Sequence, residues 1–189
     1  MYRIYLVMTA TGTMFSRFIN LFTKAGYNHI SLCLDDDIEE FYSFGRKIIW
    51  FPLVGGFVTE HADRGVYRAF RDTMCLIYEL EISKKKYLRL RAAVDEFICN
   101  RHLYRYNLLG LIGVMLNRPF RRKNHYFCTQ FVAAMLKESG IHDFKKDASL
   151  ATPHDFHNIP GITPVYEGLL SELATARGKM NASNGIAFN

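Results

Sequence analysis

The sequence lacks most features that mark metal-binding, disulfide-stabilised or membrane-spanning proteins. Its four cysteines, at positions 33, 75, 99 and 128, form no C-x-x-C pair and lie within apolar stretches. This spacing argues against a zinc site and a disulfide scaffold, and it is typical of reduced thiols. The longest lipid-like run, residues 108–116, is far shorter than the roughly 20 residues that a spanning helix needs. The N-terminal residues also lack the pattern of a signal peptide. We therefore expect a cytoplasmic protein with no transmembrane segment, metal site or cofactor.

The length and composition are those of one globular domain. The chain has 189 residues, of which 49% are hydrophobic and 22% charged, and its net charge is +6. A chain of this size can bury a core without disulfides or metal ions. Basic residues gather at positions 84–86, 118–123 and 145–146, but without a nucleic-acid-binding motif we expect no nucleic-acid partner. We expect a single domain over residues 1–170 and a weakly helical to disordered tail over residues 171–189.

The pattern of apolar residues predicts hairpins mixed with separate helices. We expect strands over residues 3–9, 28–34, 38–45, 74–82 and 165–168. We expect helices over residues 14–24, 84–100, 104–116 and 128–139, with a further helix starting at Thr152 and Pro153. Residues 47–72 contain Pro52 and the pair Gly55 and Gly56, so they are interpreted as a long loop with short strands. This order predicts an α+β domain with a small antiparallel sheet.

Cys128 stands at the predicted start of a helix and is the candidate nucleophile. Apolar residues recur after it at helical spacing, and Gly140 supplies the stop. The unpaired N–H groups and the dipole at a helix start favour a thiolate, which is the reactive form of cysteine. The alternative is that Cys128 is a small buried hydrophobic residue, as most free cysteines are.

A thiol nucleophile needs an imidazole base, and His29 is the candidate. Residues 28–34 alternate, with Ile30, Leu32 and Leu34 on one face and His29 on the other. If residues 35–37 form a three-residue loop, Leu34 pairs with Ile38, and Ser43 then stands opposite His29. The histidines at positions 102, 125, 142, 154 and 157 are each expected to be inert, although those at positions 125, 154 and 157 are alternatives that could approach Cys128.

Three segments together carry a resemblance to a known family. They are residues 28–32 (NHISL), residues 40–46 (EFYSFGR) and, after a long interval, residues 126–132 (YFCTQFV). In this order they resemble the circularly permuted NlpC/P60 papain-like cysteine hydrolases of the YiiX/YebB-like group. The resemblance implies an antiparallel sheet packed on the cysteine helix, with Cys128 as nucleophile and His29 as general base. The family's third position, often an acid, falls on Ser43, with Glu40 and Tyr42 as alternatives.

The resemblance also implies a reaction. The Cys128 thiolate would attack an amide or ester carbonyl to give an acyl-enzyme, and His29 would move the proton. The backbone N–H of Cys128 is a natural oxyanion donor because it lies at a helix start. The expected substrate is a small peptide, an acylated amine or a lipid-like molecule. Two alternatives stay open: a non-catalytic ligand-binding protein, and an acyltransferase of the lecithin:retinol acyltransferase type.

Overall fold

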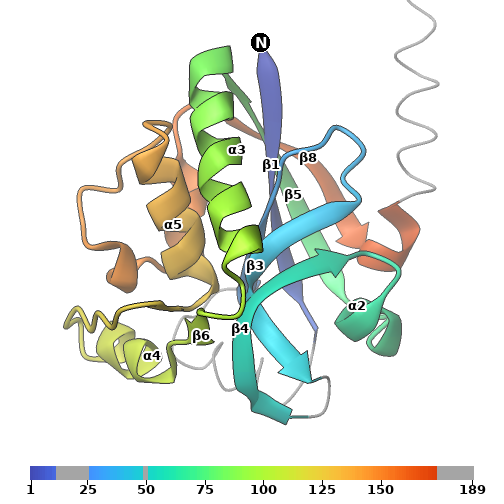
Figure 1. Cartoon of the computed structure of the whole chain (residues 1–189). Coiled ribbons are helices and arrows are strands. Elements are labelled where there is room, and N and C mark those ends of the chain that lie inside the picture. The colour runs from blue at the N-terminus through green and yellow to red at the C-terminus, as the bar shows by residue number, and fades with distance from the viewer. Residues whose placement is uncertain (12–25, 49–50, 174–189) are drawn as a thin grey trace, which may run out of the picture.

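The computed structural model describes residues 1–11, 26–48 and 51–173, and its centre is an antiparallel sheet (Figure 1). The sheet has six strands in the order β4-β3-β2-β1-β5-β8, and each neighbouring pair is antiparallel. The expected α+β class with an antiparallel sheet is therefore confirmed. The helix expected over residues 14–24 and most of the expected tail lie outside the described residues. The strands are β1 (Tyr2–Ala10), β2 (His29–Cys33), β3 (Glu40–Ile48), β4 (Phe51–His61), β5 (Met74–Ile82) and β8 (Ile162–Leu169).

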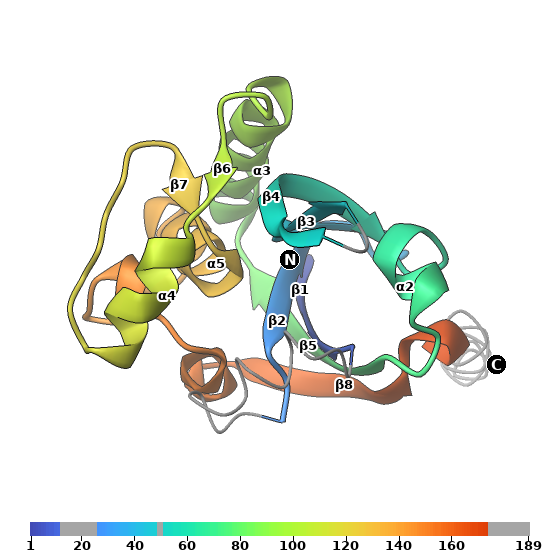
Figure 2. The ribbon, with the colours of Figure 1, turned by 90° about the horizontal axis from the view of Figure 1, so that it is seen from below.

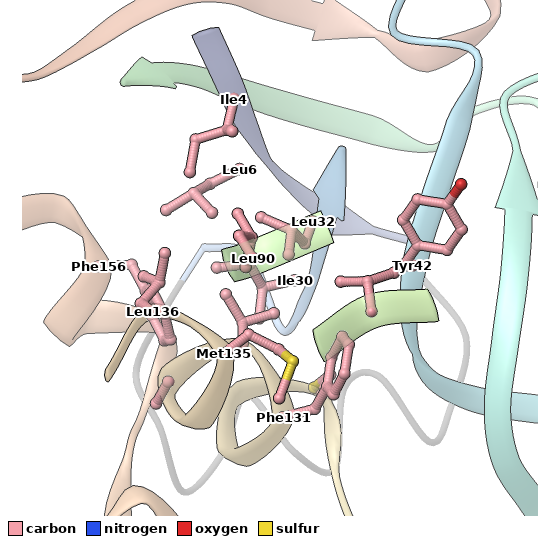
Figure 3. Packing of buried hydrophobic residues seen from close by; sticks show 14 of the residues in the cluster. Ile4, Leu6, Ile30, Leu32, Tyr42, Leu90, Phe131, Met135, Leu136 and Phe156 are labelled. Atoms are coloured by element: carbon pink, nitrogen blue, oxygen red, sulfur yellow. The ribbon is translucent and has the colours of Figure 1, made fainter. Parts of the chain in front are cut away.

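Two long helices cover one face of this sheet. They are α3 (Lys84–Cys99) and α5 (Cys128–Glu138), which lie beside each other in Figure 1. Ser83 caps α3 by accepting a hydrogen bond from the Lys86 N–H, as its position before the helix predicts. Figure 3 shows Phe131, Met135 and Leu136 of α5 beside Ile30 of β2. The predicted cysteine helix thus begins at Cys128 and packs against the sheet.

The other face of the sheet carries a second, smaller core. Tyr5, Val7, Phe41 and Ile77 are buried there together with Tyr67 of the short helix α2 (Gly65–Ala69). The expected alternation in β2 is confirmed, because Ile30 and Leu32 join the helix-side core whereas Cys33 joins the second core. His29 and Ser31 therefore belong to the face of β2 that carries the second core.

Short elements complete the fold beyond the sheet. The helix α4 (Leu108–Met115) begins later than expected, because Arg105–Tyr106 form β6, which pairs in parallel with β7 (His125–Tyr126). Figure 2 shows α4, β6 and β7 together at one edge of the molecule. Within the described residues, no helix is long and apolar enough to cross a bilayer. Short 3-10 helices span Ala148–Leu150, Pro153–Asn158 and Leu170–Glu172.

The loop expected over residues 47–72 is wrong, because β4 occupies Phe51–His61 and pairs with β3. The glycines that suggested a loop are needed for close backbone approach. A Cβ at Gly55 would lie 2.8 Å from the Gly45 carbonyl oxygen and 2.9 Å from Tyr106 Cβ. A Cβ at Gly56 would lie 2.8 Å from the Tyr104 carbonyl oxygen. Glycine here marks a strand crowded by the β6 segment, which is the other common meaning of glycine inside a strand pattern.

The expected register of the β2–β3 hairpin is also wrong. Leu32 pairs with Tyr42, so the loop between the strands is longer than three residues. Ile38, which was expected to pair with Leu34, lies in that loop with a φ of 47°. The observed pairing differs from the expected one by two positions. Each side chain therefore stays on its expected face of the sheet, but Gly45, rather than Ser43, stands opposite His29.

Candidate active site

His29 and Cys128 meet where β2 begins and α5 begins. His29 is the first residue of β2, and Cys128 is the first residue of the helix packed on that strand. The Cys128 side chain lies close enough to the His29 ring to interact with it, and this interaction helps to raise the pKa of His29. Both side chains are largely enclosed, since Cys128 is 6% exposed and the His29 side chain 19% exposed. The fold thus brings together the two residues that the sequence singles out as nucleophile and base.

The His29 ring also contacts the carboxylate of Glu60 on β4, and Ser31 Oγ lies 3.3 Å from its Nε2. His29 Nε2 lies 3.1 Å from both Glu60 oxygens, so its N–H donates to the carboxylate. Because Nε2 is engaged in this way, Nδ1 is the ring nitrogen that can serve Cys128. The side chains of Cys128, His29 and Glu60 therefore form a chain of thiol, imidazole and carboxylate.

Glu60 is held in place by two further hydroxyl groups. Ser31 Oγ donates to Glu60 Oε2 at 2.6 Å, and Tyr67 Oη donates to the same oxygen at 3.4 Å. Thr9 Oγ1 lies 3.3 Å from Tyr67 Oη and continues the network into β1. These bonds fix the carboxylate on the face where it meets His29, which is how a supporting group orients a catalytic imidazole.

The pair of His29 and Glu60 is charged near neutral pH. Burial lowers the pKa of His29, but the Glu60 charge and the hydrogen bonds to Cys128 and Glu60 outweigh it and raise that pKa to about 10. Burial raises the pKa of Glu60, but the His29 charge and the hydrogen bonds from His29, Ser31 and Tyr67 bring it below its ordinary value. A charged imidazole beside a cysteine is the arrangement that thiol catalysis uses.

Gly45 leaves the room that this pair needs. A Cβ at Gly45 would lie 3.4 Å from Glu60 Oε1, 3.7 Å from His29 Cε1 and 3.3 Å from Val58 Cγ2. β3 lies between β2 and β4 in the sheet, so His29 and Glu60 reach each other across it. A larger side chain at position 45 would stand between the two partners.

The three residues considered for the third position have other partners. Ser43 is fully buried, and its hydroxyl donates to the Ile30 carbonyl oxygen at 2.7 Å. Tyr42 Oη donates to Glu40 Oε2 at 2.7 Å, so the two alternatives contact each other. The expectation that Ser43 stands opposite His29 depended on the three-residue loop, and the observed register removes that basis. Glu60 is the carboxylate that contacts His29.

Other histidines that could have served Cys128 are engaged elsewhere. His125 Nδ1 lies 2.7 Å from the Lys123 carbonyl oxygen. His157 Nδ1 lies 2.6 Å from Tyr78 Oη, and its ring stands beside that of His154. The imidazole that meets Cys128 is that of His29.

A pocket beside Cys128 offers an apolar surface and backbone donors. Its lining combines Cys128 with Tyr106, Leu111, Val114 and Phe127. Phe127 is the N-cap residue of α5, and its side chain has no group that could accept hydrogen bonds from the N–H groups of the first turn. Those N–H groups include that of Cys128, and they can stabilise an oxyanion formed beside the sulfur.

The part of the chain that the structure describes contains no candidate metal-binding cluster. Among those residues, no group of three or more His, Cys, Asp or Glu side chains could hold a metal ion. All four cysteines are free, and Cys99 is the exposed one.

Glu60 is the site residue that sequence reasoning missed. It lies in the stretch interpreted as a loop, so its side chain had no predicted face. The signal was present in residues 57–61 (FVTEH), which carry aromatic and β-branched residues typical of a strand. Pairing this segment with β3 would have placed a carboxylate on the sheet near His29.

Comparisons with known proteins add no relatives to this picture. A scan against models of protein families, a search of curated proteins and a search of solved structures each found no match to the chain.

Proposed function

We propose that the protein is a cysteine hydrolase that cleaves an amide or ester bond through an acyl-enzyme on Cys128. The observation that carries the proposal is the His29 ring, which interacts with the Cys128 side chain and is hydrogen-bonded to the Glu60 carboxylate. A nucleophile, a base and a group that orients the base are the three parts that thiol catalysis needs. The permuted papain-like architecture implied by the sequence resemblance belongs to the same proposal.

The chemical steps follow from these positions. The Cys128 thiolate bonds to the carbonyl carbon, and the oxyanion is stabilised by N–H groups of the first turn of α5. The carbonyl re-forms as the bond to the leaving group breaks, and the His29 imidazolium gives that group its proton. The neutral imidazole then takes a proton from water, whose oxygen attacks the thioester and releases a carboxylic acid and the thiolate. Glu60 keeps the ring oriented and favours its charged form throughout.

The pocket supports an acyl group with apolar character. Tyr106, Leu111, Val114 and Phe127 line most of the apolar part of the pocket that contains Cys128, which Asn28, Thr129, Ala151, Thr152 and Pro153 complete. We therefore propose that the acyl part of the substrate is apolar, as in an acylated amine or a lipid ester.

Trapping of the acyl-enzyme tests the proposal. The protein is mixed with p-nitrophenyl esters of increasing chain length, and intact-mass spectrometry follows the addition of an acyl group. The expected result is one acyl group on the wild type, mapped to Cys128, which water removes with release of the acid. The Cys128→Ala variant should show no such adduct, and Cys99→Ala should behave as the wild type. Acylation spread equally over Cys99 and Cys128 would contradict the proposal.

A further inference from the structure

The helix α4 turns its small residues inward and its large apolar residues outward. Gly110 and Gly113 are its buried residues. A Cβ at Gly110 would lie 2.9 Å from Phe127 Cε1, and one at Gly113 would lie 2.6 Å from the Arg118 carbonyl oxygen. Large side chains therefore cannot replace the glycines, and the inward face is fixed by close backbone contact.

The outward face is unusually apolar for a surface helix. Leu109 is 45% exposed, Ile112 51%, Met115 47% and Leu116 65%. Their spacing of three and four residues puts them on one face, and Phe120 just beyond the helix is 42% exposed. A surface helix normally buries such a stripe, so an exposed one indicates an apolar partner.

Hydrogen bonds hold this helix in place. Asn107, its N-cap residue, accepts from the Gly110 N–H at 3.0 Å and donates to the Phe120 carbonyl oxygen at 3.1 Å. The same amide donates to Gln130 Oε1 of α5 at 3.3 Å. Because Asn107 is fully buried, α4 is anchored to the body of the protein with its apolar face outward.

Basic residues lie in the segment next to the apolar face. Between Glu96 and Glu138 the sequence contains seven Lys and Arg residues and no Asp or Glu. Four of the seven are exposed in the segment that leads from α4 to β7, and Asp147 pairs with one of them, Arg121. Figure 2 shows this segment beside α4 at the edge of the molecule. The four are Arg118, Arg121, Arg122 and Lys123.

We propose that the α4 face, defined by Leu109, Ile112, Met115, Leu116 and Phe120, docks the protein on the surface of a bilayer that contains anionic lipids. Apolar side chains flanked by arginine and lysine are the combination that such a surface selects, because the side chains enter the acyl boundary while the cations meet lipid phosphates. A nucleic acid would use the cations but not the apolar face. An eight-residue helix binds at the interface and does not span it.

Docking would also place the candidate active site near the lipid. Leu111 and Val114 of α4 line the pocket that contains Cys128. The binding proposal itself does not depend on the proposed hydrolase activity, so the Cys128→Ser variant should bind vesicles as the wild type does. A loss of catalysis and a loss of docking are thereby distinguishable.

Flotation with lipid vesicles tests the docking proposal. The full chain is mixed with vesicles of phosphatidylcholine alone or with phosphatidylglycerol added, and the bound fraction is measured. We expect binding to the anionic vesicles that is weakened when salt rises from about 0.05 M to about 0.5 M. The Ile112→Asp, Leu116→Asp double variant should lower the partition coefficient by roughly tenfold or more. The Arg122→Glu, Lys123→Glu double variant should remove the preference for anionic vesicles.

Matched controls come from α3. Leu88 is 54% exposed, so Leu88→Asp removes a comparable apolar side chain from another surface. Lys84→Glu with Lys85→Glu removes two exposed basic residues in the same way. Both controls should bind as the wild type does. Binding that is absent, or equally affected by the α3 controls, would overturn the proposal. A second result would also overturn it. If the wild type dimerises as its concentration rises but does not bind vesicles, and the Ile112→Asp, Leu116→Asp variant no longer dimerises, then the α4 face binds a second copy of the chain.

Discussion

His29 Nε2 lies 3.1 Å from each carboxylate oxygen of Glu60, although the two residues belong to strands that do not pair. The contact crosses β3 at Gly45, where the absence of a side chain leaves the space open. An ion pair in this position determines both the charge and the orientation of the imidazole that meets Cys128.

Replacing Glu60 with Gln should slow the chemistry of Cys128. The amide keeps the size of the side chain but removes the charge that raises the pKa of His29. The His29 ring should then be largely neutral at pH 7, because burial lowers its pKa once the carboxylate is gone. We expect acylation by an activated ester to fall by about 10²-fold or more, measured as the second-order rate constant.

Ser43→Ala is the control for that variant. Its hydroxyl contacts the Ile30 carbonyl oxygen, so the acylation rate should stay within a factor of about 3 of the wild type if Glu60 orients the imidazole. A large loss of rate in Ser43→Ala with little change in Glu60→Gln would reverse the assignment and restore the third position expected from the sequence.

The stability difference between the wild type and Glu60→Gln should depend on pH. The pKa of His29 is raised from its ordinary value of 6.5 to about 10, so its contribution is fully present below pH 6.5 and is lost as the pH rises to about 10. The pKa of Glu60 is lowered from 4.5, so its contribution is present above pH 4.5 and is lost at lower pH. Urea unfolding should show the largest difference between pH 4.5 and 6.5, and a smaller one near pH 10. A difference that grows from pH 6.5 to pH 10 would be incompatible with a charged pair.

Two buried serines on neighbouring strands should differ in their effect on stability. Ser31 donates to the Glu60 carboxylate, whereas Ser43 donates to a neutral carbonyl group. Hydrogen bonds to charged groups are stronger, so Ser31→Ala should lower the free energy of unfolding by about 1.5–3 kcal/mol and Ser43→Ala by about 1 kcal/mol. Chemical denaturation at pH 6 measures both. Equal values would show that Glu60 does not depend on Ser31.

Glycine in β4 should be essential for packing. A Cβ at Gly55 would lie 2.8 Å from a backbone oxygen and 2.9 Å from Tyr106 Cβ, neither of which can move easily. Gly55→Ala should therefore lower the free energy of unfolding by about 1–3 kcal/mol. Gly26→Ala is the matched control, because no atom of the described residues lies within 4 Å of a Cβ there. A Gly55→Ala variant as stable as the control would contradict the described contact between β4 and β6.

Local patterns were sufficient to predict the elements that carry the nucleophile and the base. The start of α5 at Cys128 follows from helical spacing and a stop at Gly140, which indeed has a φ of 71°. The face of β2 that carries His29 follows from strict alternation of apolar residues. Both are decided by neighbours in sequence, and both are confirmed.

The third residue could not be predicted in the same way because its position depends on contacts distant in sequence. Glu60 belongs to a strand whose glycines are explained by the close approach of the Gly45 carbonyl oxygen, Tyr104 and Tyr106. The hairpin register likewise depends on a loop in which Ile38 takes a positive φ, a conformation that a β-branched residue rarely adopts. Residues 57–61 do carry a local strand signal, but the crowding of β4 and the positive φ of Ile38 depend on contacts distant in sequence.

Selective alkylation of the four cysteines tests the central claim most directly. The protein is treated with a limiting amount of iodoacetamide between pH 5 and 8, and modification of each cysteine is followed by peptide mass spectrometry. Cys75 is buried, which raises its pKa to about 12, and Cys99 is the exposed reference thiol. We predict that Cys128, although only 6% exposed, reacts at least about tenfold faster than Cys99 at pH 6, and that Glu60→Gln removes this advantage. Slow labelling of Cys128, equal to that of Cys33 and Cys75, would contradict the account.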